Sequence, residues 1–195
     1  MKIKEKLHPV NVFYKICKNY SKENINFNFS IYIYKEKGKT HSRKYIKIPA
    51  PDLSSNLLNN ILSKLHPEEE FACHSLVDVS GKKRYIPLID FSVENESLLP
   101  WEFINEKKEL FDTDFYLFFS GRSYHGYFTT FITYQKWLKF AGDLLLLNQP
   151  NSYPTEIIDS RWVGHSIING FSALRWSSNT NKYLSEPRLT CMIKP

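Results

Sequence analysis

The sequence has little of what marks several common protein classes. Its 195 residues include three cysteines, Cys17, Cys73 and Cys191, which are widely spaced and form no Cys-x-x-Cys pair. A disulfide framework is therefore not expected, and the cysteine usage favours a reducing, cytoplasmic setting. Apolar runs such as residues 144–147 are far shorter than the roughly 18 residues of a membrane-spanning helix. We therefore expect no membrane association.

Several sorting and catalytic signals are also missing. The N-terminal residues are basic and contain no apolar segment with a small-residue cleavage site, so no signal peptide is expected. No P-loop, Gly-x-Ser-x-Gly elbow, His-Glu-x-x-His pair or zinc-ligand spacing occurs, which argues against those enzyme classes. Cys73-His74 and the distant Cys191 are a weak candidate for part of a metal site. Buried free thiols are the favoured interpretation.

The residues that are abundant indicate a globular protein with a basic N-terminal region. Hydrophobic residues make up 42% and charged residues 24%, which excludes disordered and coiled-coil classes, and the 14 Phe, 12 Tyr and 4 Trp suit sheets, cores and base-stacking surfaces. Residues 1–50 hold 12 Lys or Arg against 3 acids, whereas the rest holds 14 against 17. A polyanion would meet the N-terminal quarter first. The alternative is a solvated basic hairpin.

Hydrophobic periodicity predicts one α+β domain with a mixed or antiparallel sheet packed against helices. We expect a hairpin of residues 26–35 and 40–48 around Lys37-Gly38-Lys39, and a helix that begins near Leu53 and ends before Pro67. Further strands are expected at 83–95, 114–120, 123–131, 155–159, 173–178 and 188–193, and helices at 101–110, 133–148 and 161–170. Residues 1–67 are predicted to be an accessory part of the domain, and residues 68–195 its core.

The first candidate site lies in the predicted strand 83–95. Asp90, Ser92 and Glu94 alternate, so in a strand their side chains share one face. A carboxylate at the end of a buried strand is a common position for a metal ligand. The alternative is that Asp90 caps the turn that follows.

The second candidate site is the segment Ser120-Gly121-Arg122-Ser123-Tyr124-His125-Gly126. Glycine permits a tight turn, and Arg122, Ser123 and His125 supply hydrogen-bond donors that suit a phosphate group. The alternative is that His125 is a packed residue of a structural strand.

The third candidate site begins at Asp159, which ends a short apolar strand and also suits the N-cap of the next helix. Arg161 and His165 are four residues apart on that helix and share a face. Arg175 would come from the following strand. These cations beside a carboxylate fit a triphosphate with its metal ion.

The order of these segments resembles the archaeo-eukaryotic primase superfamily, the primase–polymerase group. That family has an acidic pair, a Ser-x-His and a hydrophobic-Asp motif, which correspond here to Asp90-Phe91-Ser92, Ser123-Tyr124-His125 and Ile158-Asp159. Asp90 and His125 are 35 residues apart, and His125 and Asp159 are 34 apart. The resemblance covers about residues 70–195 and implies an RNA-recognition-like catalytic core.

The resemblance also implies roles for the candidate residues. Asp90 and Asp159, with Glu94 as a further ligand, would hold two Mg²⁺ or Mn²⁺ ions, and Asp90, His125 and Asp159 would be the catalytic set. The phosphates of a nucleoside triphosphate would be bound by Arg122, Ser123, His125, Arg161, His165 and Arg175.

The implied activity is that of a DNA-directed nucleotidyltransferase. Its partners would be single-stranded DNA or a primer–template, and a helicase or other replication protein that gives access to the template. The chain departs from the family pattern at Ser92, where a second acid is usual. A neutral hydroxyl is a weaker Mg²⁺ ligand than a carboxylate. The alternative function is therefore a catalytically degenerate domain that binds nucleic acid, a nucleotide or a protein partner.

Overall fold

The computed structural model describes residues 7–33, 43–151, 153–154, 156–180, 182 and 185–194. The α-helices are α1 (Val10–Asn19), α2 (Ser55–Leu62), α3 (Trp101–Phe111), α4 (Tyr134–Leu145) and α5 (Ser160–Asn169). The strands are β1 (Ile25–Ile33), β2 (Arg43–Pro49), β3 (Glu69–Val79), β4 (Lys82–Tyr85), β5 (Leu88–Asp90), β6 (Phe115–Phe119), β7 (Tyr124–Phe128), β8 (Ala173–Arg175) and β9 (Arg188–Ile193). Helices and strands are interspersed along the chain, which confirms the α+β class.

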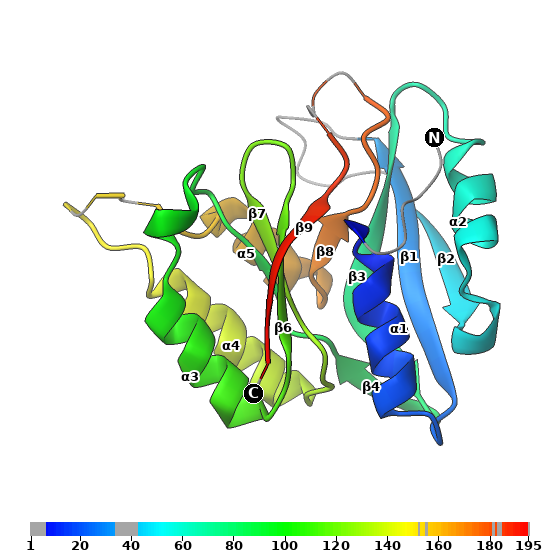
Figure 1. The fold of residues 1–195 in the computed structure, drawn as a ribbon, viewed down its shortest axis with the longest axis horizontal. Coiled ribbons are helices and arrows are strands. Elements are labelled where there is room, and N and C mark those ends of the chain that lie inside the picture. The colour runs from blue at the N-terminus through cyan, green and yellow to red at the C-terminus, as the bar shows by residue number, and fades with distance from the viewer. Residues whose placement is uncertain are drawn as a thin grey trace.

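The strands form two antiparallel sheets (Figure 1). Sheet A has the order β2-β1-β3-β4, and β8 pairs with the other end of the long strand β3. Sheet B has the order β5-β7-β6-β9. Edge strands β8 and β5 contact each other, so the two sheets meet along these edges.

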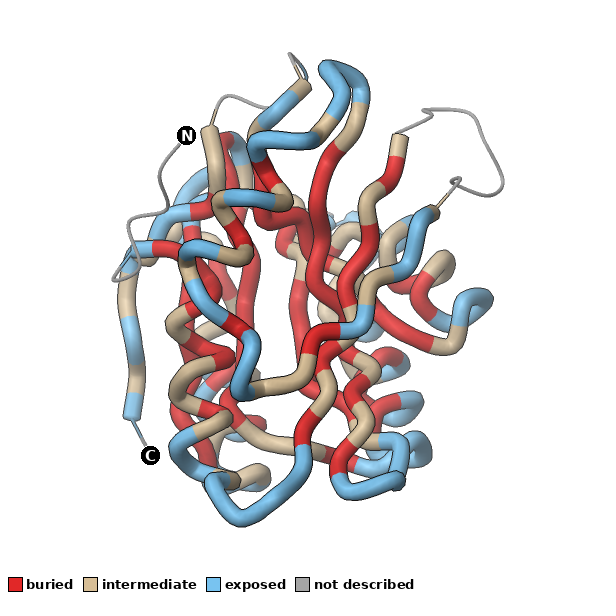
Figure 2. Tube along the Cα trace, turned by 90° about the vertical axis from the view of Figure 1, so that its right-hand side faces the viewer, coloured by how far each residue is buried: buried red, intermediate tan, exposed pale blue. Residues whose placement is uncertain are grey.

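Both faces of sheet B are covered by apolar residues. One face contributes Tyr116 and Tyr127 to a core that it shares with sheet A and α1. The other face packs Phe115 and Phe128 against α3, α4 and α5. Figure 2 shows the strands mostly buried and the outer faces of the helices exposed. Sheet B is therefore held from both sides, and the strand ends at its β5 edge are fixed in position.

The predicted strand 83–95 is wrong in its extent, because it is two short strands that belong to different sheets. β4 pairs with β3 in sheet A, whereas β5 pairs with β7 in sheet B. Pro87 lies between them and has no backbone N–H to donate to a ladder, so the chain changes sheets there. The strand then ends at Asp90, followed by a single bridge between Phe91 and Ile158.

Other differences concern the N-terminal half. Helix α1 and the long strand β3 were not expected, and both carry buried residues of the core shared by the two sheets. The predicted hairpin arms agree with β1 and β2, whereas its loop at Gly38 lies outside the described residues. The division at residue 67 stays a prediction. β1 and β2, from before it, lie in one sheet with β3 and β8.

Candidate active site

Strand pairing brings the first two candidate motifs together. β5 and β7 are antiparallel, and Asp90 lies directly opposite His125. Asp90 Oδ1 lies 3.6 Å from His125 Nε2, with 22% of the Asp90 side chain and 7% of the His125 side chain exposed. Two residues that are 35 positions apart in the sequence therefore form one side-chain pair.

Gly126, the residue after His125, has no room for a side chain. A Cβ atom at this position would lie 2.8 Å from the Phe115 ring and 3.2 Å from the Phe91 ring. Phe115 and Phe91 are themselves buried. Glycine next to His125 therefore lets two aromatic rings pack closely against the strand that carries the histidine.

The third motif joins the pair through the backbone. The Asp159 N–H donates to the Asp90 carbonyl oxygen at 3.0 Å, next to the bridge between Phe91 and Ile158. Asp159 is also the N-cap of α5, because its Oδ1 accepts from the Trp162 N–H at 2.9 Å. The N-cap interpretation of Asp159 is therefore confirmed, and its charge lies within electrostatic reach of Asp90. The strand expected at 155–159 is wrong, because among its described residues only Ile158 pairs, in a single bridge with Phe91.

Arg175 on β8 brings positive charge from sheet A. It is buried, and its guanidinium donates to the carbonyl oxygens of Ser120 and Ser177 and, at 3.2 Å, of Ser185. These bonds tie the loop before β7 to the segment after β8. The predicted phosphate contact of Arg175 is untested, and in this structure its donors hold backbone carbonyls.

Burial and like charge make the Asp90 carboxyl hard to ionise. Burial first, and the Asp159 charge second, raise the pKa of Asp90 to about 8, while Arg175 and Arg122 oppose the shift. Burial and the Arg175 charge lower the pKa of His125 to about 3, so its imidazole is neutral at pH 7. Among the described residues His125 Nδ1 has no hydrogen-bond partner. Such a buried, unsatisfied group is costly and is typical of functional sites.

The loop between β6 and β7 presents the other phosphate-binding candidates. Ser120 N–H donates to the Ser123 carbonyl oxygen at 2.8 Å, which closes a tight turn. Gly121 has φ 104°, which favours glycine, and a Cβ there would lie 3.0 Å from Ser185 N. Arg122 is exposed and Ser123 half-buried. The turn therefore holds Arg122 at the surface, within electrostatic reach of Asp90.

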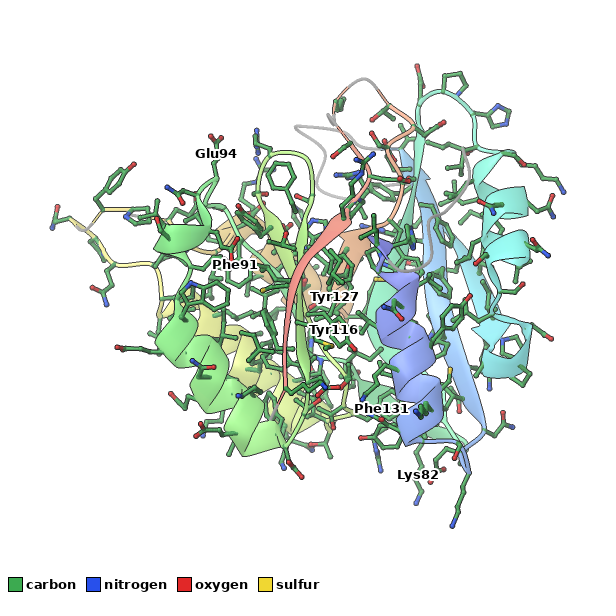
Figure 3. All side chains as sticks on the ribbon, viewed as in Figure 1. Lys82, Phe91, Glu94, Tyr116, Tyr127 and Phe131 are labelled. Atoms are coloured by element: carbon green, nitrogen blue, oxygen red, sulfur yellow. The ribbon has the colours of Figure 1, made fainter. Side chains whose placement is uncertain are left out.

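Glu94 lies elsewhere. The expectation that Asp90, Ser92 and Glu94 share a strand face is wrong, because the strand ends before Ser92, whose N–H donates to the Ile157 carbonyl oxygen. Glu94 is exposed, and Figure 3 shows it at the outer end of the loop, pointing away from the protein. The metal role of Glu94 stays a prediction without support from its position.

Arg161 and His165 both lie on α5, as predicted. Arg161 is exposed in the first turn, and His165 is half-buried one turn later. The arginine charges that act on the Asp90 pKa come from Arg175 and Arg122. The nucleotide role of Arg161 and His165 stays a prediction.

Sequence reasoning missed Glu70, a fully buried carboxylate on β3. It accepts hydrogen bonds from the Ser177 hydroxyl, the Asn179 N–H, and both the N–H and the hydroxyl of Thr180. Glu70 thus fixes the segment that follows Arg175. Glu70 is the last of three consecutive glutamates before the apolar residues 71–73, so the sequence gives no signal that separates it from the exposed Glu68.

The donor set fits one divalent cation better than two. Asp90 and Asp159 supply two carboxyl groups whose charges act on each other, and Mg²⁺ is commonly held by one or two carboxylates together with substrate phosphates. In the described part of the chain, no group of three or more His, Cys, Asp or Glu side chains could hold a metal ion. Cys73 and Cys191 are both free and lie in different sheets. The interpretation of buried thiols fits Cys73, whereas Cys191 is half-buried.

Comparison with known protein families identifies the family of this chain. Among the described residues, no helix combines the length and apolar character needed to cross a membrane. Searches of curated proteins and of solved structures gave no match. A family model described as archaeo-eukaryotic primase 1D-like matches residues 49–188, which include Asp90, His125 and Asp159 and extend beyond the expected N-terminal limit near residue 70. The match covers well over half of the chain, which therefore belongs to this archaeo-eukaryotic primase-like family.

Proposed function

We propose that this protein is a DNA-directed nucleotidyltransferase of the primase–polymerase type. The observation that carries the proposal is the Asp90–His125 pair, with the second carboxylate of Asp159 held beside it by a backbone hydrogen bond. Membership of the primase-like family supports the reaction class. The substrates would be a nucleoside triphosphate and the 3′-hydroxyl of a DNA primer or of an initiating nucleotide on single-stranded DNA.

The chain's residues divide between the cation and the phosphates. Asp90 and Asp159 would hold Mg²⁺ or Mn²⁺, which would activate the attacking 3′-oxygen and neutralise charge on the leaving pyrophosphate. Ser123 would donate its hydroxyl to a phosphate oxygen. His125 is neutral in the free protein, and a neighbouring phosphate would favour its donating, protonated form.

Arg122 and Arg175 would act on the triphosphate from different positions, one at the surface and one buried. Arg122 is exposed on the tight turn before β7, so it can reach the triphosphate from solvent. Arg175 is buried, and its charge would stabilise the phosphates from behind the two carboxylates while it keeps the loop in position. Arg161 and His165 would extend this cationic surface along α5. A reducing, cytoplasmic setting suits the free cysteines.

The test is incorporation of labelled nucleotides on single-stranded DNA and on a primer–template, with Mg²⁺ or Mn²⁺. We expect product from the wild-type protein and loss of at least about 100-fold with Asp90→Ala and with His125→Ala. Glu102→Ala is the matched control, because this exposed carboxylate on α3 is outside the candidate set and its loss should leave the rate unchanged. Product that persists in Asp90→Ala would overturn the assignment.

The second candidate function is a degenerate, non-catalytic binding domain. It is favoured by Ser92, which stands where the family usually has a second acid, and by the absence of a three-ligand metal cluster among the described residues. Ser92→Asp discriminates between the two. A rise in nucleotide incorporation would show that the site assembles for catalysis. If the wild type and Ser92→Asp are both inactive but bind single-stranded DNA, the protein is a binding domain.

A further inference from the structure

A row of residues connects the carboxylate site with the far edge of sheet A. Tyr45 pairs with Ser30, Ser30 with Ala72, and Ala72 with Arg175. Directly paired residues of antiparallel strands have side chains on the same face of the sheet. With neighbouring strands about 4.8 Å apart, Tyr45 on edge strand β2 lies about 14 Å across this face from Arg175. Arg175 in turn acts on the charge of Asp90.

Tyr45 has an exposed aromatic ring that packs on two buried rings. Its side chain is 63% exposed, although Tyr is a large and largely apolar residue. Its ring makes T-shaped contacts with His74 and Phe171, with centroids 5.7 and 6.2 Å apart, so neither ring lies parallel on a face of Tyr45. His74 and Phe171 are buried and stack on each other at 4.2 Å. A hydrogen bond between His74 Nε2 and the Ser30 hydroxyl, at 2.8 Å, also holds the His74 ring in place.

Positive charge flanks this ring. Arg43 and Lys47 lie two residues to either side of Tyr45 on β2, so their side chains share its face. Arg43 is held by a hydrogen bond to the Ser30 hydroxyl and by the Tyr32 ring, 4.6 Å away. Lys47 pairs at 3.3 Å with Asp78 in an exposed ion pair, which contributes little and can be exchanged for a phosphate. Alternating cations and an exposed aromatic ring are what single-stranded nucleic acid binds.

We propose that Tyr45 stacks on a base of single-stranded DNA, and that Lys47 and Arg43 hold the adjoining phosphates on the path to the carboxylate site. The inference rests on the proposed function, because it assigns the DNA strand a contact at the β2 edge of sheet A. Ser30 and Ala72, which lie between Tyr45 and Arg175, are buried, so the strand contacts the exposed edge of this face. Stacking on the flat ring does not depend on base identity, so this contact would hold the strand without reading its sequence.

The experiment measures binding of a fluorescein-labelled single-stranded DNA of about 12 nucleotides by anisotropy, at low and at physiological salt. Tyr45→Ala should raise the Kd about tenfold, whereas Tyr45→Phe, which keeps the ring, should bind like wild type. Tyr153→Ala is the matched control, since Tyr153 is 89% exposed and lies outside this face. Thermal unfolding verifies that each variant is folded.

The outcomes separate the two proposals. Unchanged affinity of Tyr45→Ala, or blunt duplex DNA competing as well as single strands, overturns the stacking site, while nucleotide incorporation by wild type leaves the proposed function standing. A wild-type protein that neither binds single strands nor incorporates nucleotides overturns both. Weaker binding by Tyr45→Ala with the ring-retaining variant unaffected supports the site.

Discussion

Asp90 and His125 face each other across β5 and β7, with 3.6 Å between Asp90 Oδ1 and His125 Nε2. Asp90 holds its proton unusually tightly because burial and the Asp159 charge disfavour its ionised form, whereas burial keeps His125 neutral. The site thus has a carboxyl group that is hard to ionise and, within the described residues, an imidazole nitrogen without a hydrogen-bond partner. Neighbouring residues hold this site together, and their roles can be tested one at a time.

The two roles of Asp159, as the N-cap of α5 and as a negative charge near Asp90, can be tested separately. Asparagine is as good an N-cap as aspartate, so Asp159→Asn should leave stability nearly unchanged, whereas Asp159→Ala should cost about 1 kcal/mol. Both variants should lose nucleotide incorporation. Because Asp159→Asn removes a like charge, the pKa of Asp90 should fall, measured by NMR titration of the carboxyl carbon. An unchanged Asp90 pKa would contradict the proximity of the two carboxylates.

Gly126→Ala should destabilise the protein and displace His125. The added methyl would lie 2.8 Å from a Phe115 carbon, and the packed ring cannot move away without disturbing its neighbours. We expect a loss of about 1–3 kcal/mol in urea unfolding. Gly142→Ala is the control, because a Cβ at this helical position meets no atom within 4 Å and alanine favours helix. Equal stability of the two variants would refute the packing argument.

Glu70→Gln should weaken the segment that follows Arg175. It replaces a buried carboxylate that accepts from Ser177, Asn179 and Thr180, so charge-assisted hydrogen bonds are lost. The expected cost is about 2–3 kcal/mol, with faster amide hydrogen exchange at residues 177–180. Glu68→Gln, at an exposed position, should show neither effect. Unaltered exchange in Glu70→Gln would mean that other contacts fix the segment.

His8 should make stability dependent on pH. It accepts from the Val10 N–H at Nδ1, so its Nε2 carries the hydrogen and donates to the Trp176 carbonyl oxygen. Burial lowers the pKa of His8 from 6.5 to about 4. Below pH 6.5 the unfolded chain takes up a proton that the folded protein does not, so stability decreases as the pH falls from 6.5 to 4.

The His8 contribution is complete above pH 6.5 and amounts to about 3 kcal/mol. Urea unfolding of wild type and His8→Gln at pH 7, 6, 5 and about 4 isolates it, since other titrating groups are common to both proteins. The stability difference should shrink towards low pH. A difference that stays constant with pH would show that His8 does not titrate as described.

The sequence alone determined the order of the chemical motifs and several of the helices, strands and turns. Apolar periodicity located α4 and α5, and Asp159 and Gly170 predicted the two ends of α5 because a side-chain acceptor and a left-handed glycine are local requirements. Gly121 likewise predicted the turn between β6 and β7. The three motifs that indicate the primase-like family depend only on residue type and spacing.

Only the tertiary structure decided which of these residues meet. The pairing of β5 with β7 puts Asp90 opposite His125. β5 ends at Asp90, so Ser92 lies outside the strand and Glu94 lies on the surface. The row from Tyr45 to Arg175 crosses four strands from distant parts of the chain. Strand register and sheet order depend on packing between distant segments, and local sequence carries little information about them.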